Sequence, residues 1–206
     1  MEWNLLTAQN LAIIDQEIDK SRFSSAEYEI VRRVISITGD LNYSSLVNFS
    51  ADVFKFAVKA LNDRVPIIVD KATIQTGIFN ALQHSFLNPI YSLENISLPV
   101  SLRQKKSLLL ENLALRYSSA IFIIGQNSPM LIYLLDLIEL YPIQPSLIIA
   151  TPSGFFRKEM INNRLKESSI PHIRIDSSKG GIDVAIAIFN GLVDVAWIGK
   201  KLTIKD

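Results

Sequence analysis

The stretch that decides the fold is AIFIIGQNSPMLIYLLDLIEL, residues 120–140, which joins an apolar run to a helical pattern through a short turn. Residues 120–124 are apolar on both faces and rich in β-branched side chains, as expected for a parallel strand that is covered on both sides. Gly125 is expected to end this strand. Ser128 then has the residue type of a helix N-cap, and Pro129 follows at the first helical position, where its missing N–H costs nothing.

A helix completes this first unit, and a second unit of the same kind follows it. Apolar residues recur three and four positions apart within 131–138, which predicts a helix that lies back on the sheet. Residues 146–150 predict the next strand, and the Pro-Ser-Gly turn at 152–154 ends it. The carboxyl ends of two neighbouring strands therefore carry turns of small residues, at the edge where open α/β sheets usually bind ligands.

Capping residues and apolar periodicity predict the remaining elements. Ser24 and Glu27 have the spacing of a capping box, Ser50 is expected to cap the third helix, and Ser101 the fifth. The predicted further helices are one capped by Thr7 or Asn10 and ending near Ser21, then 24–39, 51–62, 71–78, 101–116, 155–166 and 182–192; the predicted further strands are 65–69, 172–175 and one edge strand within 80–96. The pattern of residues 41–49 favours neither a helix nor a strand. These elements predict an α/β fold formed by one domain over residues 1–206.

The composition excludes several classes of protein and site. Lys and Arg number 21 and Asp and Glu 20, so the charge balance gives no support for nucleic acid or an anionic membrane surface as a partner. The absence of cysteine excludes disulfides, thiolate metal sites and cysteine nucleophiles, and two histidines are too few for a histidine-rich metal site. The first residues lack the pattern of a signal peptide and no apolar run approaches membrane-spanning length, so we expect a cytoplasmic location.

The common nucleotide and hydrolase motifs are absent from the sequence. The turn at Gly125 lacks the spaced glycines of a dinucleotide site, no P-loop is present, and Ser153 lacks the flanking glycines of a nucleophile elbow. Lys179, Gly180 and Gly181 precede a predicted helix and could form an anion cradle, although such a turn more often only connects a strand to a helix. Periodicity alone therefore predicts an α/β domain with a ligand site of unknown identity.

A family resemblance enters at IVRRVISITGDLNY and continues over roughly residues 5 to 192. The other matching pieces are SRFSSAEYEIVRRVI, PIIVD, SLRQKKSLLLE, AIFIIGQNSPMLIYLLDL, IIATPSGF and SSKGG. Their order and spacing resemble the precorrin-8X methylmutase family, also called cobalt-precorrin-8 methylmutase. The resemblance implies a three-layer α/β/α fold with a flavodoxin-like, doubly wound, mostly parallel sheet, and a homodimer. It also implies an isomerase of corrin biosynthesis that moves a methyl group between ring carbons of a tetrapyrrole, with no cofactor.

The sequence departs from the family pattern at the position of its acid. Ser36 stands where the family has its proton-handling histidine, and a hydroxyl cannot act as an acid near neutral pH as an imidazole does. Gln9 and Asn10 replace an Arg-Ser pair, although Asn10 can still donate a hydrogen bond to the substrate. After the PSGF turn, the chain reads RKEMINNR and lacks the family's Glu-Ser-Lys pattern. These departures put catalysis more in question than binding.

On this resemblance, four side chains are assigned to the site. Ser36 takes the place of the family's acid, Asn10 donates a hydrogen bond to the substrate, and Arg103 and Lys179 bind carboxylates of the anionic tetrapyrrole. Each assignment has a structural alternative, because Ser36 could be only a polar residue in a last helical turn and Arg103 only a surface cation.

The turn glycines and one aspartate complete the predicted site. Gly125, Gly154, Gly180 and Gly181 are expected to let backbone N–H groups approach the ligand, unless they only form turns. Asp70, at the end of the strand 65–69, is counted with the substrate-binding residues or else caps the helix that follows it.

Two other functions remain open from the sequence. A relative that kept the pocket and lost the acid could be a non-catalytic tetrapyrrole binder or product carrier, and an isomerase of another tetrapyrrole is a third hypothesis. His84 and His172 are possible replacement acids, although a surface or strand-end role is the commoner one for such histidines.

Overall fold

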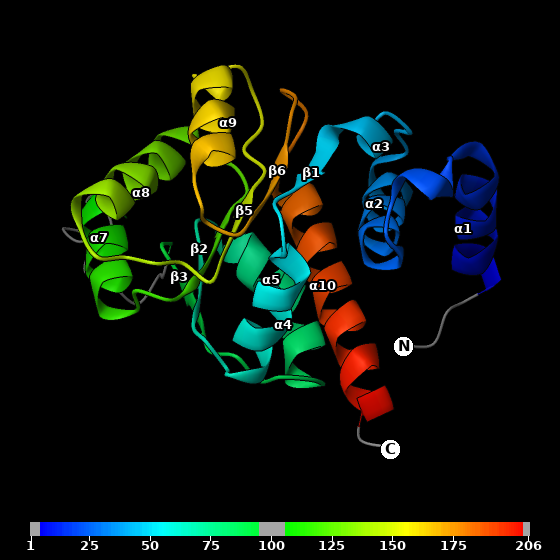
Figure 1. Cartoon of the computed structure of the whole chain (residues 1–206), viewed down its shortest axis with the longest axis horizontal. Coiled ribbons are helices and arrows are strands. Elements are labelled where there is room, and N and C mark those ends of the chain that lie inside the picture. The colour runs from blue at the N-terminus through cyan, green and yellow to red at the C-terminus, as the bar shows by residue number, and fades with distance from the viewer. Residues whose placement is uncertain (1–4, 95–105, 204–206) are drawn as a thin grey trace.

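The computed structural model describes residues 5–94 and 106–203, and it shows a central sheet with helices on both faces (Figure 1). The strands are β1 (Val47–Phe49), β2 (Ile67–Val69), β3 (Ile90–Ser92), β4 (Ile121–Ile124), β5 (Leu147–Ala150) and β6 (His172–Ile175). The helices are α1 (Leu5–Glu17), α2 (Ser25–Thr38), α3 (Tyr43–Leu46), α4 (Val53–Asn62), α5 (Ala72–Gln83), α7 (Lys106–Arg116), α8 (Ser128–Leu140), α9 (Lys158–Glu167) and α10 (Ile182–Thr203), with a 3-10 turn at Lys20–Arg22.

The sheet has the strand order β1-β6-β5-β4-β2-β3. β1 is antiparallel to β6, and the other neighbouring strands are parallel. Counted along the chain, the parallel strands lie in the order 2-1-3-4-5, which is the doubly wound order of flavodoxin. The predicted flavodoxin-like, mostly parallel sheet is therefore confirmed, and the antiparallel β1 comes from the segment 41–49 whose state the sequence pattern did not decide.

Two apolar cores lie on opposite faces of the sheet, because successive side chains of a strand point to opposite sides. Ile121 and Ile123 of β4 belong to the core beneath α1, α2, α4, α5 and α10. Phe122 and Ile124 belong to the core beneath α7, α8 and α9. All four side chains are fully buried, so the apolar run at the start of the deciding stretch forms a strand that is covered on both faces.

The local signals at the ends of α2 act as the sequence predicts. Ser24 accepts a hydrogen bond from the Glu27 N–H at 3.3 Å, and the Glu27 carboxylate accepts one from the Ser24 N–H at 2.7 Å. Gly39 closes the helix in the left-handed conformation, with φ +66°. These contacts fix both ends of the helix that carries Ser36.

Several predicted helix starts are wrong. Asn127, rather than Ser128, accepts from the Met130 N–H and caps α8. Ser50 does not cap α4, since its hydroxyl accepts the His172 N–H across the sheet. The described part of α1 begins at Leu5, ahead of both predicted caps, and α9 begins at Lys158. The predicted cap Ser101 lies outside the described residues.

α10 extends beyond the predicted end of its helix and packs against α2, α4 and α5. By length and composition its segment Ile182–Lys201 could cross a membrane, which corrects the expectation that no apolar run approaches that length. Half of its most apolar window is buried inside the protein. A Cβ on Gly191 would lie 3.0 Å from a carbon of Ile30, so the glycine lets α10 and α2 approach closely.

Candidate functional site

The segments that follow the parallel strands meet at one edge of the sheet, called here the carboxyl edge. Because β1 is antiparallel, the segment that precedes it reaches the same edge, where the Asp176 N–H donates to the Leu46 carbonyl at 2.9 Å. In Figure 1 the start of α9, the orange segment after β6 and α3 all lie along the top of the view. The positions of the predicted site residues are described relative to this edge.

Asp70 holds the turn between β4 and α8 at the point where the strand order reverses. Its carboxylate accepts backbone N–H groups from Gly125 at 2.9 Å, Gln126 at 3.0 Å and Asn127 at 2.9 Å. Burial raises the pKa of Asp70, and the three donors oppose this rise. The prediction that Asp70 caps its own helix is wrong, since Lys71 is the N-cap residue of α5. While Asp70 holds these N–H groups, an anionic ligand cannot use them.

The glycines of the next two turns serve contacts within the protein. The Gly154 N–H donates to the Ser178 carbonyl at 2.8 Å, and the Gly181 N–H donates to the Thr151 carbonyl at 2.6 Å. A Cβ on Gly180 would lie 2.4 Å from the Thr151 oxygen, so only glycine allows these turns to touch. The N–H groups of Gly125, Gly154 and Gly181 are therefore occupied by contacts within the protein, and their approach to a ligand stays a prediction.

An ion pair brings the Lys179 loop to the end of α2. Lys179 Nζ lies 2.5 Å from Asp40 Oδ2, and this hydrogen bond lowers the pKa of Asp40 below its ordinary value. Ser36 is exposed on the last turns of the same helix. Two of the predicted site residues, Ser36 and Lys179, thus lie at the same end of α2, although Lys179 already has a carboxylate partner.

The other two predicted side chains come from other parts of the chain. Asn10 is exposed on α1, which packs against α2 (Figure 1). Arg103 lies outside the described residues.

A second ion-pair group stands at the carboxyl edge beyond β3. Glu94 Oε1 lies 2.9 Å from Lys71 Nζ and 2.7 Å from Lys106 Nζ. Burial alone would raise the pKa of Glu94, but these two lysines outweigh burial and lower the pKa to about 2. The sequence analysis missed this group because its members come from three separate segments.

Lys158 is the other residue of interest that sequence reasoning missed. Its Nζ donates to the Pro152 carbonyl at 3.1 Å, at the end of β5, and burial lowers its pKa to about 8. The signal was present in the sequence, since Lys158 belongs to the RKEMINNR segment that departs from the family pattern.

Both histidines lie away from the carboxyl edge, which removes them as replacement acids there. His172 begins β6 and is buried, with Nδ1 2.8 Å from the Ile170 carbonyl and Nε2 3.0 Å from Arg174. Burial lowers the pKa of His172 below its ordinary value. His84 is exposed at the far end of α5, where Nδ1 lies 2.8 Å from the Asn80 carbonyl. Within the described chain, no group of three or more possible metal ligands occurs.

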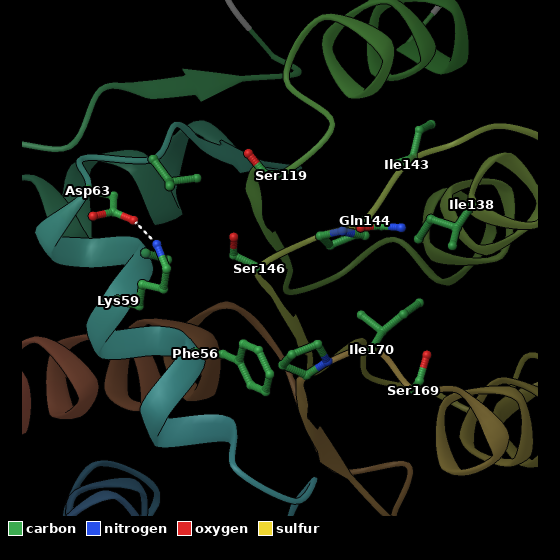
Figure 2. A pocket seen from close by; sticks show the side chains of 14 residues that line it. Phe56, Lys59, Asp63, Ser119, Ile138, Ile143, Gln144, Ser146, Ser169 and Ile170 are labelled. Carbon is green, nitrogen blue, oxygen red and sulfur yellow. Dashed lines mark hydrogen bonds and ion pairs between the residues drawn. The ribbon is translucent and has the colours of Figure 1, made fainter.

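The cavity drawn in Figure 2 opens at the opposite edge, called here the amino edge, where the strands begin. It holds about 600 Å³ between α4, the end of α8 and the segments that lead into β4, β5 and β6. Apolar side chains such as Phe56 and Ile170 line it together with serines such as Ser119 and Ser146. Its charged lining residues, Lys59 and Asp63, bond to each other. The cavity therefore offers space but no unpaired charge for acid or base chemistry.

Comparisons with known proteins identify the family of the chain. The model of a family described as precorrin-8X methylmutase matches residues 6–195. A cobalt-precorrin-8 methylmutase of Methanocaldococcus jannaschii is 31% identical over 182 residues, which cover 85% of this chain and 83% of that protein. One of Synechocystis is 28% identical over 206 residues, covering 92% and 94% respectively.

A solved structure agrees with this assignment. The precorrin-8X methylmutase of Thermus thermophilus superposes with a TM-score of 0.85 at 26% identity, over 95% of this chain and 99% of that one. The chain belongs to the precorrin-8X methylmutase family.

Proposed function

We propose that this protein is an isomerase of cobalamin biosynthesis, which moves a methyl group from one ring carbon to its neighbour within precorrin-8X or cobalt-precorrin-8. The match to the family model over residues 6–195 carries this proposal. It is supported by relatives that are named cobalt-precorrin-8 methylmutase and that align with most of the chain.

We assign the reaction to the carboxyl edge, around the end of α2. Ser36 lies on the last turns of α2, and the ion pair of Lys179 with Asp40 holds the Lys179 loop against the end of this helix. Asn10 and Arg103 complete the proposed site, with Asn10 donating to the substrate and Arg103 binding a carboxylate. The glycine turns support the site by letting the loops after β5 and β6 pack together.

The partners and the location belong to the same proposal. The anionic tetrapyrrole is the ligand, and we expect a cytoplasmic homodimer that works without a cofactor. Sedimentation of the purified chain measures the assembly, and a monomer at micromolar concentration would contradict the dimer.

The decisive experiment is incubation of the purified chain with precorrin-8X while the absorption spectrum is followed. Conversion supports the isomerase. Stoichiometric binding of pigment with an unchanged spectrum would support the alternative of a non-catalytic binder or product carrier, which the serine at position 36 favours. Binding of another tetrapyrrole in preference to this one would point to a different isomerase.

The substitution Ser36→His tests the assignment of the lost acid. A well-placed acid contributes roughly 100-fold to 10,000-fold in rate, so we expect kcat to rise by about that factor. Ser36 is exposed, and the change should leave the fold intact. The matched control Ser169→His, also exposed but at the amino edge, should leave kcat unchanged. An unchanged kcat in Ser36→His would contradict the assignment.

A further inference from the structure

Residues 155–158, called here the aromatic–basic segment, expose two large aromatic side chains at the carboxyl edge. Phe155 is 87% exposed and Phe156 is 55% exposed. The segment follows the turn after β5 and ends at the start of α9. Single apolar side chains on a surface need no explanation, but adjacent phenylalanines at a ligand-binding edge indicate a surface that a partner molecule covers.

The cations of this segment differ from the other lysines of the same edge. Lys71 and Lys106 share Glu94, and Lys179 bonds Asp40. In contrast, neither Arg157 nor Lys158 forms an ion pair with any residue in the described ranges. Arg157 instead lies over the Phe156 ring, with its guanidinium carbon 5.6 Å from the ring centre.

Lys158 is held in place and is also kept partly out of water. Its Nζ donates to the Pro152 carbonyl at 3.1 Å, and burial lowers its pKa to about 8 while Asp176 partly opposes this. Asp176 is itself bonded to Arg174 and paired with Lys166, so its charge is already compensated. A positioned, partly desolvated ammonium without its own carboxylate binds an external carboxylate more strongly than a fully hydrated one.

Direct contacts connect the segment to the end of α2. The turn before the segment donates through the Gly154 N–H to the Ser178 carbonyl, and the next residue, Lys179, bonds Asp40. The segment and the helix end that carries Ser36 are therefore parts of one continuous surface rather than separate patches.

We propose that the aromatic–basic segment is a recognition element for the tetrapyrrole, in which Phe155 and Phe156 contact the face of the ring and Arg157 and Lys158 bind carboxylates at its periphery. This inference rests on the proposed function. A flat apolar ring with acidic side chains needs both kinds of contact, and the segment presents both within four consecutive residues. Arg157 and Lys158 would thus determine specificity for a polyacid, whereas the phenylalanines determine affinity for the ring.

The proposal predicts a pH dependence with a definite sign. A bound carboxylate favours the charged ammonium, so the pKa of Lys158 is higher in the complex than its value of about 8 in the free protein. The affinity of the protein for the tetrapyrrole is therefore highest below pH 8, where Lys158 is charged. It falls as the pH rises from about 8 through the pKa of Lys158 in the complex. Lys158→Arg keeps the charge at all these pH values and should abolish this dependence.

The test is titration of the full chain with precorrin-8X, with the dissociation constant and KM measured from pH 6.5 to 9.5. Lys158→Gln and Arg157→Gln should each raise the dissociation constant about tenfold, because each removes a charge-assisted hydrogen bond. Phe155→Ser should raise it about threefold to tenfold. Lys55→Gln, an exposed lysine on α4 that also forms no ion pair with the described residues, is the matched control and should leave it unchanged.

The outcomes separate this inference from the function on which it rests. The inference is supported if the wild-type chain binds precorrin-8X, the Gln and Ser variants bind it more weakly, and Lys158→Arg binds it equally well at pH 7 and pH 9. Wild-type conversion with unchanged dissociation constants in the variants overturns the inference alone. A wild-type chain that neither binds nor converts precorrin-8X overturns both. A dimer that Phe155→Ser turns into a monomer, with binding unchanged, would show that a second copy of the chain covers the phenylalanines and would also overturn the inference.

Discussion

The two edges of the sheet differ in charge and in open space. The carboxyl edge carries the Lys179–Asp40 pair and the lysines on Glu94, and its turns are packed closely around glycines. The amino edge carries the cavity of about 600 Å³, whose one ion pair, Lys59–Asp63, is exposed. Among the described residues, ion pairs and closely packed turns therefore lie where the parallel strands end, whereas this cavity lies where they begin. This hollow is a poorer guide to chemistry than the polar groups.

The largest effect that we expect at the carboxyl edge comes from Asp70→Ala. The change leaves three backbone N–H groups of the 125–127 turn without their acceptor, and it should lower the free energy of unfolding by about 3 kcal/mol or more. Asp70→Asn keeps one acceptor oxygen and should lower the free energy of unfolding by a smaller amount. Denaturant unfolding measures both.

The control for that change is Asp63→Ala at the amino edge. Within residues 5–94 and 106–203, Asp63 pairs only with the exposed Lys59, and we expect the free energy of unfolding to fall by at most about 1 kcal/mol. An equal loss of unfolding free energy in Asp70→Ala and Asp63→Ala would contradict the expected difference between the two edges.

A smaller effect is expected from Gly180→Ala, which tests how tightly the turns of the carboxyl edge are packed. The added methyl group would meet the Thr151 carbonyl, and overpacking of this kind typically costs about 1 to 3 kcal/mol. Since the two turns must separate, we also expect KM to rise.

The comparison variant is Gly199→Ala in α10, where no described atom outside the local helix lies within 4 Å of the new Cβ. Alanine favours a helix over glycine, so the unfolding free energy should rise by about 0.5 to 1 kcal/mol. If Gly199→Ala lowered the free energy of unfolding as much as Gly180→Ala does, close packing of the turns could not be the reason for the loss in Gly180→Ala.

The smallest effect is expected from filling the cavity at the amino edge with Ser169→Trp. Ser169 is exposed at the rim of this cavity, so the unfolding free energy should change by no more than about 0.5 kcal/mol. Turnover of precorrin-8X should be unchanged. A loss of turnover without a loss of stability would show that the amino edge takes part in function and would break the comparison.

The sequence was sufficient where the structural signal is local. The capping box of Ser24 and Glu27 and the left-handed Gly39 depend on neighbours within four residues, and both are confirmed. The apolar strand runs are also confirmed, since burial on both faces requires apolar residues at successive positions. The cap of α8 was misplaced by one residue because Asn127 and Ser128 are both good capping types.

The sequence was not sufficient where the partner of a residue lies far along the chain. Asp70 reads as an ordinary N-cap until the fold brings residues 125–127 to it, 55 to 57 positions away. Ser50 likewise reads as a cap, whereas its partner, His172, is 122 positions away. The carboxylate partner of Lys179, Asp40, is 139 positions away, so the sequence did not show that this lysine, assigned to a substrate carboxylate, also bonds one within the protein.

The pairing of β1 with β6 has a consequence for biosynthesis of the chain. A ribosome delivers the segment that ends at Phe49 long before it delivers His172, and until then β1 has no strand beside it. The Asp40–Lys179 and Leu46–Asp176 contacts must wait as well. The carboxyl edge can thus close only after residues 172–179 have been synthesised, however early the strands before them pair.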